Sequence, residues 1–208
     1  MPKIEVEHRG YLSEKKFKSL QKLFKKEGKF LGKKRRFSVI YSPLQEINTY
    51  VLSDKSPVDL KIRITNKRTE MVLKYGLWSG KDARKEFLFE IDSKKFSELV
   101  EFFKLIGFYH GVLQATETYL YFYKGAEIAL VNVPSWGYYF EVEMAVPKKD
   151  IKKAEKRIAD ICNNLDLKVL NHKNFCELLK DLNNRPGYRF NFKKEGFSAV
   201  KKRFIKYF

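Results

Sequence analysis

The sequence contains the pattern Glu-x-Glu twice, at Glu5 and Glu7 and again at Glu141 and Glu143. Each pair lies in a stretch of alternating apolar and polar residues, which is typical of a β-strand and places both glutamates on one face. Carboxylates gathered in this way repel one another, so burying them requires a cation. Their oxygens are hard ligands that suit Mg²⁺ or Mn²⁺. The two patterns therefore predict a divalent metal site.

A set of basic side chains lies on similar alternating stretches. Its members are Arg9, Lys61, Arg63, Lys74 and Arg84. The planar fork of arginine binds phosphate oxygens bidentately, whereas lysine acts as a point charge. A basic row facing the carboxylates would hold phosphate groups that the metal also binds. The acidic and basic sets together predict a site for a phosphate-bearing anion.

The elements that must position these residues are mostly strands. Strand-like runs occur at 4–9, 36–41, 51–52, 60–64, 70–75, 84–91, 114–123, 127–133 and 138–146. Helical spacing follows Ser13, a candidate N-cap, and recurs over 94–106, 148–165 and 171–182. About eight strands form a closed barrel whose interior holds its own side chains or one small ligand. The charged faces would line that interior; in an open sheet they would face water.

The composition adds a strong excess of positive charge. Among 208 residues, 43 are Lys or Arg and 25 are Asp or Glu, which gives a net charge of +18 and favours an anionic partner. The two cysteines fit a reducing compartment. The first residues are charged where a secretory signal is apolar, and no stretch approaches the roughly 20 apolar residues that span a bilayer. We therefore expect a cytoplasmic protein with no membrane partner.

Over residues 3–182 the chain resembles the CYTH family, the class IV adenylyl cyclase and thiamine-triphosphatase group also called triphosphate tunnel enzymes. The resemblance rests on an ordered set of motifs: Glu5-Val6-Glu7-His8-Arg9 for Glu-x-Glu-x-Lys, Leu60-Lys61-Ile62-Arg63 for Leu-Arg-x-Arg, Leu73-Lys74-Tyr75-Gly76, Arg84-Lys85-Glu86, and Gly137 with Glu141-Val142-Glu143. It implies an α+β fold, a closed antiparallel β-barrel (triphosphate tunnel) of about eight strands with helices packed outside. Residues 1–183 would form this domain, and 184–208 a basic aromatic C-terminal extension.

The resemblance also implies roles for individual residues. Arg9 and Lys74 would be catalytic, and the whole basic set would bind the triphosphate. Mg²⁺ or Mn²⁺ would be held by the four glutamates and by Asn132, which stands where the family has an Asp. An amide gives up one negative charge, so we expect weaker metal binding than with five carboxylates. Gln114 and Thr116 replace a usual basic pair, which favours binding over turnover.

Three classes of function follow. The first is metal-dependent binding and hydrolysis of inorganic triphosphate, thiamine triphosphate or a nucleoside triphosphate; the same tunnel in a class IV adenylyl cyclase would make cyclic AMP from ATP. The second is a non-catalytic triphosphate or polyphosphate binding module. The third, less favoured, is nucleic-acid binding through the net charge and the tail at 185–208, where aromatics alternate with lysines. We expect that tail instead to dock through its phenylalanines, Phe190, Phe192, Phe197 and Phe204.

Overall fold

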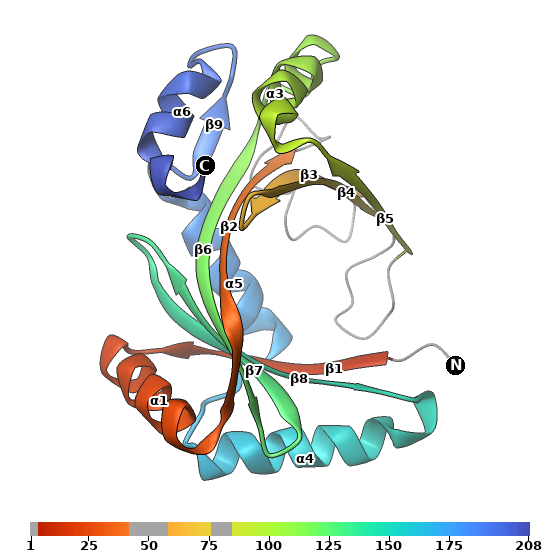
Figure 1. Cartoon of the computed structure of the whole chain (residues 1–208), viewed down its shortest axis with the longest axis vertical. Helices are drawn as coiled ribbons and strands as arrows, with labels where there is room; N and C mark the ends of the chain where they lie inside the picture. Colours follow the sequence, from red (N-terminus) through yellow and green to blue (C-terminus); the bar gives the residue numbers. More distant parts are fainter. Residues whose placement is uncertain (1–3, 42–57, 76–84) are drawn as a thin grey trace. The chain divides into compact units, whose positions relative to one another are not determined.

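The computed structural model describes residues 4–41, 58–75 and 85–208. The strands are β1 (Ile4–Leu12), β2 (Lys29–Tyr41), β3 (Val58–Thr65), β4 (Arg68–Tyr75), β5 (Lys85–Ile91), β6 (His110–Tyr123), β7 (Ala126–Val133), β8 (Gly137–Val146) and β9 (Arg189–Asn191) (Figure 1). The helices are α1 (Glu14–Glu27), α3 (Phe96–Leu105), α4 (Ile151–Asn164), α5 (His172–Asn184) and α6 (Phe197–Arg203), with 3-10 turns η1 (Ser93–Lys95), η2 (Lys148–Asp150) and η3 (Ile205–Tyr207). The predicted strand at 51–52 lies outside the described residues.

The strands form a sheet with the order β1-β8-β7-β6-β2-β3-β4-β5, and β9 pairs with β6. The pairings with a described register are antiparallel, which confirms an α+β fold with an antiparallel sheet of the predicted size. Between the described strands no hydrogen-bonded pairing joins β1 to β5. The predicted closed barrel is therefore not confirmed, because the described strands are not closed by hydrogen bonds.

The chain divides into two compact units. The first consists of residues 1–34 and 116–175, and the second of residues 35–115 and 176–208. The long strands β2 and β6 each contribute residues to both. The predicted boundary after residue 183 does not coincide with this division, because the C-terminal segment belongs to the second unit.

In the first unit, α1 begins where Ser13 caps it. The Ser13 hydroxyl accepts a hydrogen bond from the backbone N–H of Lys16 at 3.2 Å, so one otherwise unsatisfied donor of the first turn is paired. Phe17, Leu20 and Phe24 recur at helical spacing and are buried, while the lysines between them point to solvent. The helix is therefore held by one apolar stripe, as its sequence spacing predicts.

The α1 stripe packs into a core that it shares with α4. Ile158 of α4 and Phe140 of β8 are fully buried in the same cluster as Phe24. Figure 1 shows α1 and α4 beside the strands β1, β8 and β7. On these strands the residues facing the helices alternate with residues on the opposite face, as period-two geometry requires. Two helices thus cover one face of the strands, and the charged residues of β1 and β8 occupy the other.

In the second unit, the C-terminal segment completes a core. Phe190 of β9 lies opposite Gly111 of β6, and Phe204 packs on Phe37 of β2 with ring centroids 5.0 Å apart. Phe190, Phe192 and Phe204 are buried, as the docked-tail interpretation expects. The segment thus contributes buried rings to the second unit. No helix in the described part of the chain is both long and apolar enough to cross a membrane.

Candidate functional site

The pairing of β1 with β8 brings the two Glu-x-Glu patterns together. Glu7 lies directly opposite Glu143, and Arg9 directly opposite Glu141. Directly opposed residues of an antiparallel pair project from the same face. The four residues therefore share the face that α1 and α4 leave uncovered, although they come from distant parts of the sequence.

The backbone around Arg9 is held by a crossing segment of chain. The N–H of Leu170 donates a hydrogen bond to the carbonyl oxygen of Arg9 at 2.8 Å. At the next residue, Gly10, a Cβ atom would overlap the carbonyl oxygen of Lys168 and the ring of Phe140. Glycine is needed there because two backbone segments meet, and this contact fixes the strand that carries Arg9.

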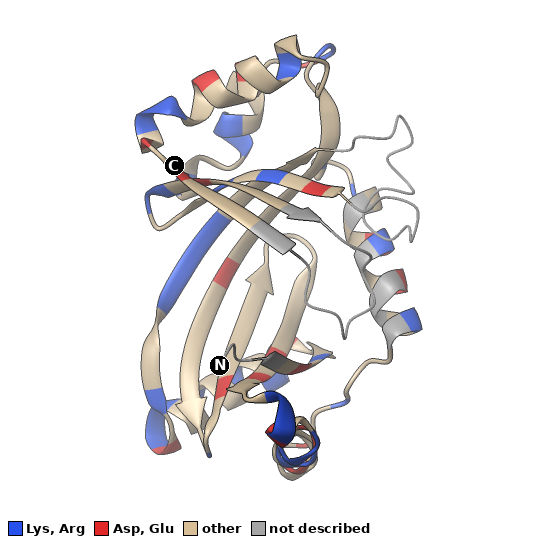
Figure 2. Cartoon of the chain, turned by 90° about the vertical axis from the view of Figure 1, so that its right-hand side faces the viewer, with Lys and Arg blue, Asp and Glu red and all other residues tan. Residues whose placement is uncertain are grey.

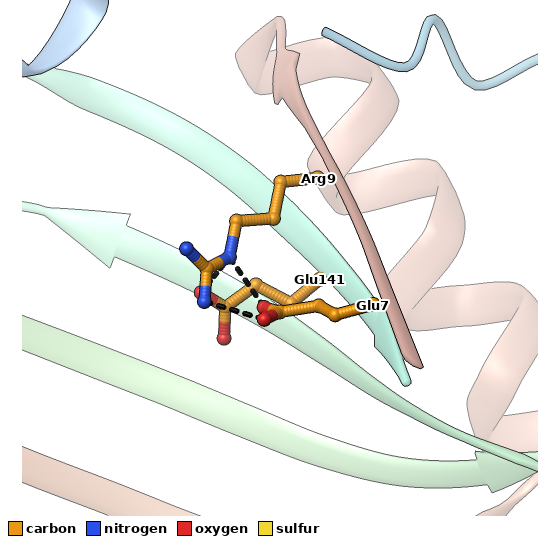
Figure 3. A network of polar contacts seen from close by, with 3 residues as sticks. All are labelled: Glu7, Arg9 and Glu141. Atoms are coloured by element: carbon orange, nitrogen blue, oxygen red, sulfur yellow. Dashed lines mark hydrogen bonds and ion pairs between the residues drawn. The ribbon is translucent and has the colours of Figure 1, made fainter. Parts of the chain in front are cut away.

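Arg9 joins two carboxylates from neighbouring strands (Figure 3). Its Nε and Nη2 atoms donate to the two carboxylate oxygens of Glu7, the second at 2.6 Å, and Nε lies 3.1 Å from Oε1 of Glu141. The side chains are 34% exposed for Arg9, 24% for Glu7 and 25% for Glu141, so water weakens these ion pairs only in part. The guanidinium is a cation held by carboxylates of both Glu-x-Glu patterns.

The electrostatics of this cluster are set by burial and by the neighbouring charged groups. Burial raises the pKa of the Glu141 carboxyl well above its usual range; Arg9 opposes this shift, and Glu7 and Glu143 add to it. Burial disfavours the charged form of Arg9, but Glu141 and Glu7 outweigh that effect, so the Arg9 pKa is raised and the guanidinium stays charged. Arg9 thus offsets only part of the combined effect of burial and of the neighbouring carboxylates on the Glu141 pKa.

The register adds a glutamate that sequence reasoning did not include in the site. Glu127 of β7 lies directly opposite Glu143, which in turn lies opposite Glu7. These three glutamates form one row across β7, β8 and β1. The signal was the short turn between β7 and β8: once it aligns Val133 with Gly137, the hairpin register places Glu127 opposite Glu143.

The position of Glu5 is opposite Ala145, and its side chain is outside the described part.

The prediction for Asn132 is corrected by the same register. Asn132 lies opposite Tyr138 of β8 and Glu117 of β6, in the set that includes Leu130 and Phe140. That set faces the helices, and Glu141 projects from the other face. Because neighbouring positions on a strand point in opposite directions, Asn132 cannot share a cation with Glu141. Asn132 was matched to the family's Asp by its order along the chain alone. That match selected a residue on the face of β7 that points away from Glu141.

The predicted basic residues of the second unit also share a face. Lys61 and Arg63 alternate on β3 with the buried residues Ile62 and Ile64. Lys61 pairs with Asp59 at 3.0 Å, and Arg63 pairs with Glu70 of β4 at 2.5 Å. Figure 2 shows acidic and basic residues interspersed on these strands. The acidic partners were not predicted.

The other two predicted basic residues are described only in part or not at all. Position 74 lies opposite Asp59 and is thus on the same face as Lys61 and Arg63, but its side chain is outside the described part. Arg84 lies outside the described residues. Their roles stay predictions.

Comparison with known proteins was informative only at the level of structure. No protein-family model and no curated protein matches the chain. A protein from Pyrococcus horikoshii OT3 is 22% identical with a TM-score of 0.63, covering 85% of this chain and 98% of that chain. A candidate adenylate cyclase from Vibrio parahaemolyticus is 14% identical with a TM-score of 0.55, covering 86% and 99%. A candidate adenylyl cyclase from Hippeastrum, described as having a dominant triphosphatase activity, is 12% identical with a TM-score of 0.54, covering 97% and 96%.

The chain has the CYTH fold. At these identities the likeness concerns the fold, so the chemistry of the site must be judged from its own residues. On the CYTH fold of this chain, the glutamates Glu7, Glu141 and Glu143 gather on one face of β1 and β8. The first and last motifs of the sequence resemblance therefore lie together on two neighbouring strands.

The predicted metal site depends on which oxygen donors lie together. Within the described residues, no three acidic, histidine or cysteine side chains are grouped as ligands of one metal ion. Two carboxylates nevertheless direct their oxygens to one cationic group, the Arg9 guanidinium, and Glu143 and Glu127 lie in the adjacent row. Carboxylate oxygens are the donor type that a hard divalent cation takes. The metal site stays a prediction.

Proposed function

We propose that the protein binds a triphosphate compound together with Mg²⁺ or Mn²⁺ and hydrolyses it. The observation that carries this proposal is the convergence of Glu7 and Glu141, from the first and last of the predicted motifs, on one cationic group. A site that already holds a positive charge with carboxylates from two strands has the donor chemistry for a hard cation. The shared fold with a protein described as having triphosphatase activity supports the proposal.

The roles of the residues follow from their chemistry. Glu7, Glu141 and Glu143 would hold the cation, with Glu5 as predicted from the sequence and Glu127 added by the register. When bound, a divalent cation polarises phosphoryl oxygens and offsets the charge that develops on them. The protein side chains then position the substrate and neutralise the remaining charge.

Phosphate oxygens would be bound by the basic residues. Arg9 lies beside the carboxylates and offers a bidentate fork, so it can bind a phosphate that the same cation touches. The sequence motifs predict Lys61, Arg63, Lys74 and Arg84 as phosphate ligands in the second unit. Asp59 and Glu70 now occupy the first two, so substrate oxygens would compete with these carboxylates.

A second candidate is adenylyl cyclase activity, favoured by the fold shared with candidate cyclases. The same binding site would serve both reactions, because both require neutralisation of a triphosphate. The two differ in their products. A hydrolase releases inorganic phosphate, whereas a cyclase releases pyrophosphate and cyclic AMP from ATP. The third candidate, a non-catalytic binding module, releases neither.

One assay separates these possibilities. The purified chain is incubated with tripolyphosphate, thiamine triphosphate and ATP, each with Mg²⁺ or Mn²⁺, and phosphate, pyrophosphate and cyclic AMP are measured. We expect phosphate release that Glu7→Gln abolishes. Glu155→Gln, a change at an exposed position of α4, is the matched control and should leave the rate unchanged. Binding of a triphosphate without any product would leave the binding module as the function, and a chain that binds none of the three compounds would contradict the proposal.

A further inference from the structure

We infer that Arg9 is an internal counter-ion for the carboxylates. A metal ion must displace the Arg9 guanidinium from them, and the guanidinium then binds the incoming triphosphate. The inference rests on the proposed function and concerns how that site is loaded. Its basis is the geometry of the guanidinium. Nε and Nη2 engage both oxygens of Glu7, and Nε also lies 3.1 Å from Glu141.

Competition follows from the atoms involved. The carboxylate oxygens that would bind a cation are those that accept hydrogen bonds from Arg9. A hard cation at ligand distance from them would stand close to the guanidinium, and two positive charges there repel each other. Metal binding to the free protein therefore requires that Arg9 leave at least one of the two carboxylates.

The choice of arginine makes this competition stronger. The motif that the sequence resembles has lysine at this position, and lysine offers a compact point charge on a flexible stem. Arginine offers a planar fork that pairs with a carboxylate through two parallel hydrogen bonds. The fork of Arg9 makes such a pair with Glu7 and still reaches Glu141 across the strands. Displacing it costs more than displacing a single lysine contact.

A triphosphate changes the balance. The released guanidinium remains charged and needs an anionic partner; the oxygens of a phosphate bound to the same cation supply one. A bare cation must displace Arg9 without this compensation, whereas a cation that carries a triphosphate replaces one anionic partner of Arg9 with another. Removing Arg9 should thus strengthen binding of the bare cation and weaken binding of the complex.

Calorimetry at physiological ionic strength tests this on Arg9→Gln and Arg9→Lys, with Mn²⁺ alone and with preformed Mn²⁺–tripolyphosphate. For Arg9→Gln we expect bare Mn²⁺ to bind about tenfold more tightly, which corresponds to about 1.4 kcal/mol, and the complex to bind more weakly. Arg9→Lys keeps the charge and loses the fork, so we expect a smaller gain for bare Mn²⁺. The control Lys33→Gln removes a lysine that pairs with Glu117 on the helix-facing side of the strands, and should change neither affinity by more than about twofold.

A measurement on the unaltered chain distinguishes displacement of Arg9 from the alternative that its positive charge only lowers metal affinity from a distance. The Nε–H signal of Arg9, assigned by its absence in Arg9→Lys, should shift when diamagnetic Mg²⁺ is added. Mg²⁺ binding without movement of this signal, or equal affinities of wild type and Arg9→Gln for bare Mn²⁺, would overturn the inference while leaving the proposed function intact. If neither wild type nor Arg9→Gln binds bare or complexed Mn²⁺, the proposed function itself fails, and the inference with it.

Discussion

Replacing Asn132 with aspartate tests whether strand register decides which side chains share a cation. The register places Asn132 opposite Glu117, whose carboxylate lies 2.9 Å from the amine of Lys33. Like charges directly opposite each other on neighbouring strands destabilise the pair by about 0.2–1 kcal/mol, and Lys33 offsets part of this. In a chain of this size each kcal/mol lowers the melting temperature by about 2–4 °C, so we expect Asn132→Asp to lower it by at most about 4 °C.

Metal affinity is the decisive measurement for this variant. Because residue 132 projects away from Glu141, the new carboxylate should leave Mn²⁺ affinity unchanged, as measured by titration calorimetry beside thermal unfolding followed by circular dichroism. A carboxylate added to the ligand set would instead tighten binding, by about tenfold for a gain of about 1.4 kcal/mol. Glu143→Gln shows that the assay is sensitive, since it should weaken Mn²⁺ binding. A tenfold gain from Asn132→Asp with an unchanged melting temperature would refute the placement of Asn132 on the helix-facing side.

Three further outcomes are expected. Glu127→Gln should weaken Mn²⁺ binding without unfolding the chain, because Glu127 lies opposite Glu143; an unchanged affinity in calorimetry would remove it from the site. Residues 1–183 expressed alone should lack a cooperative unfolding transition, since the cut removes the buried Phe190, and a sharp transition like that of the full chain would contradict this. Phe24→Ala should destabilise the chain by about 3–5 kcal/mol in denaturant unfolding, because the ring is fully buried and packs against Tyr121 and Tyr123; a loss below about 1 kcal/mol would contradict this packing.

Local periodicity was sufficient to predict which side chains of one strand share a face. Glu7 and Arg9 are two residues apart, as are Glu141 and Glu143, and each pair lies on one face as predicted. The α1 stripe and its Ser13 cap were predictable for the same reason. These features depend only on neighbours in the chain, because the repeats of 2 and 3.6 residues are properties of the backbone itself.

Pairing between distant strands could not be predicted from such neighbours. The alignment of β1 with β8 placed Arg9 against Glu141 and Glu7 against Glu143. A shift of one residue would move every side chain of a strand to the other face, and an alternating pattern fits several registers almost equally well. The sequence by itself thus determined the kinds of charged faces and their chemistry. Only the tertiary structure decided which carboxylates meet and that an arginine joins two of them, because hydrogen-bonded register between distant segments is set by the packing of the whole sheet.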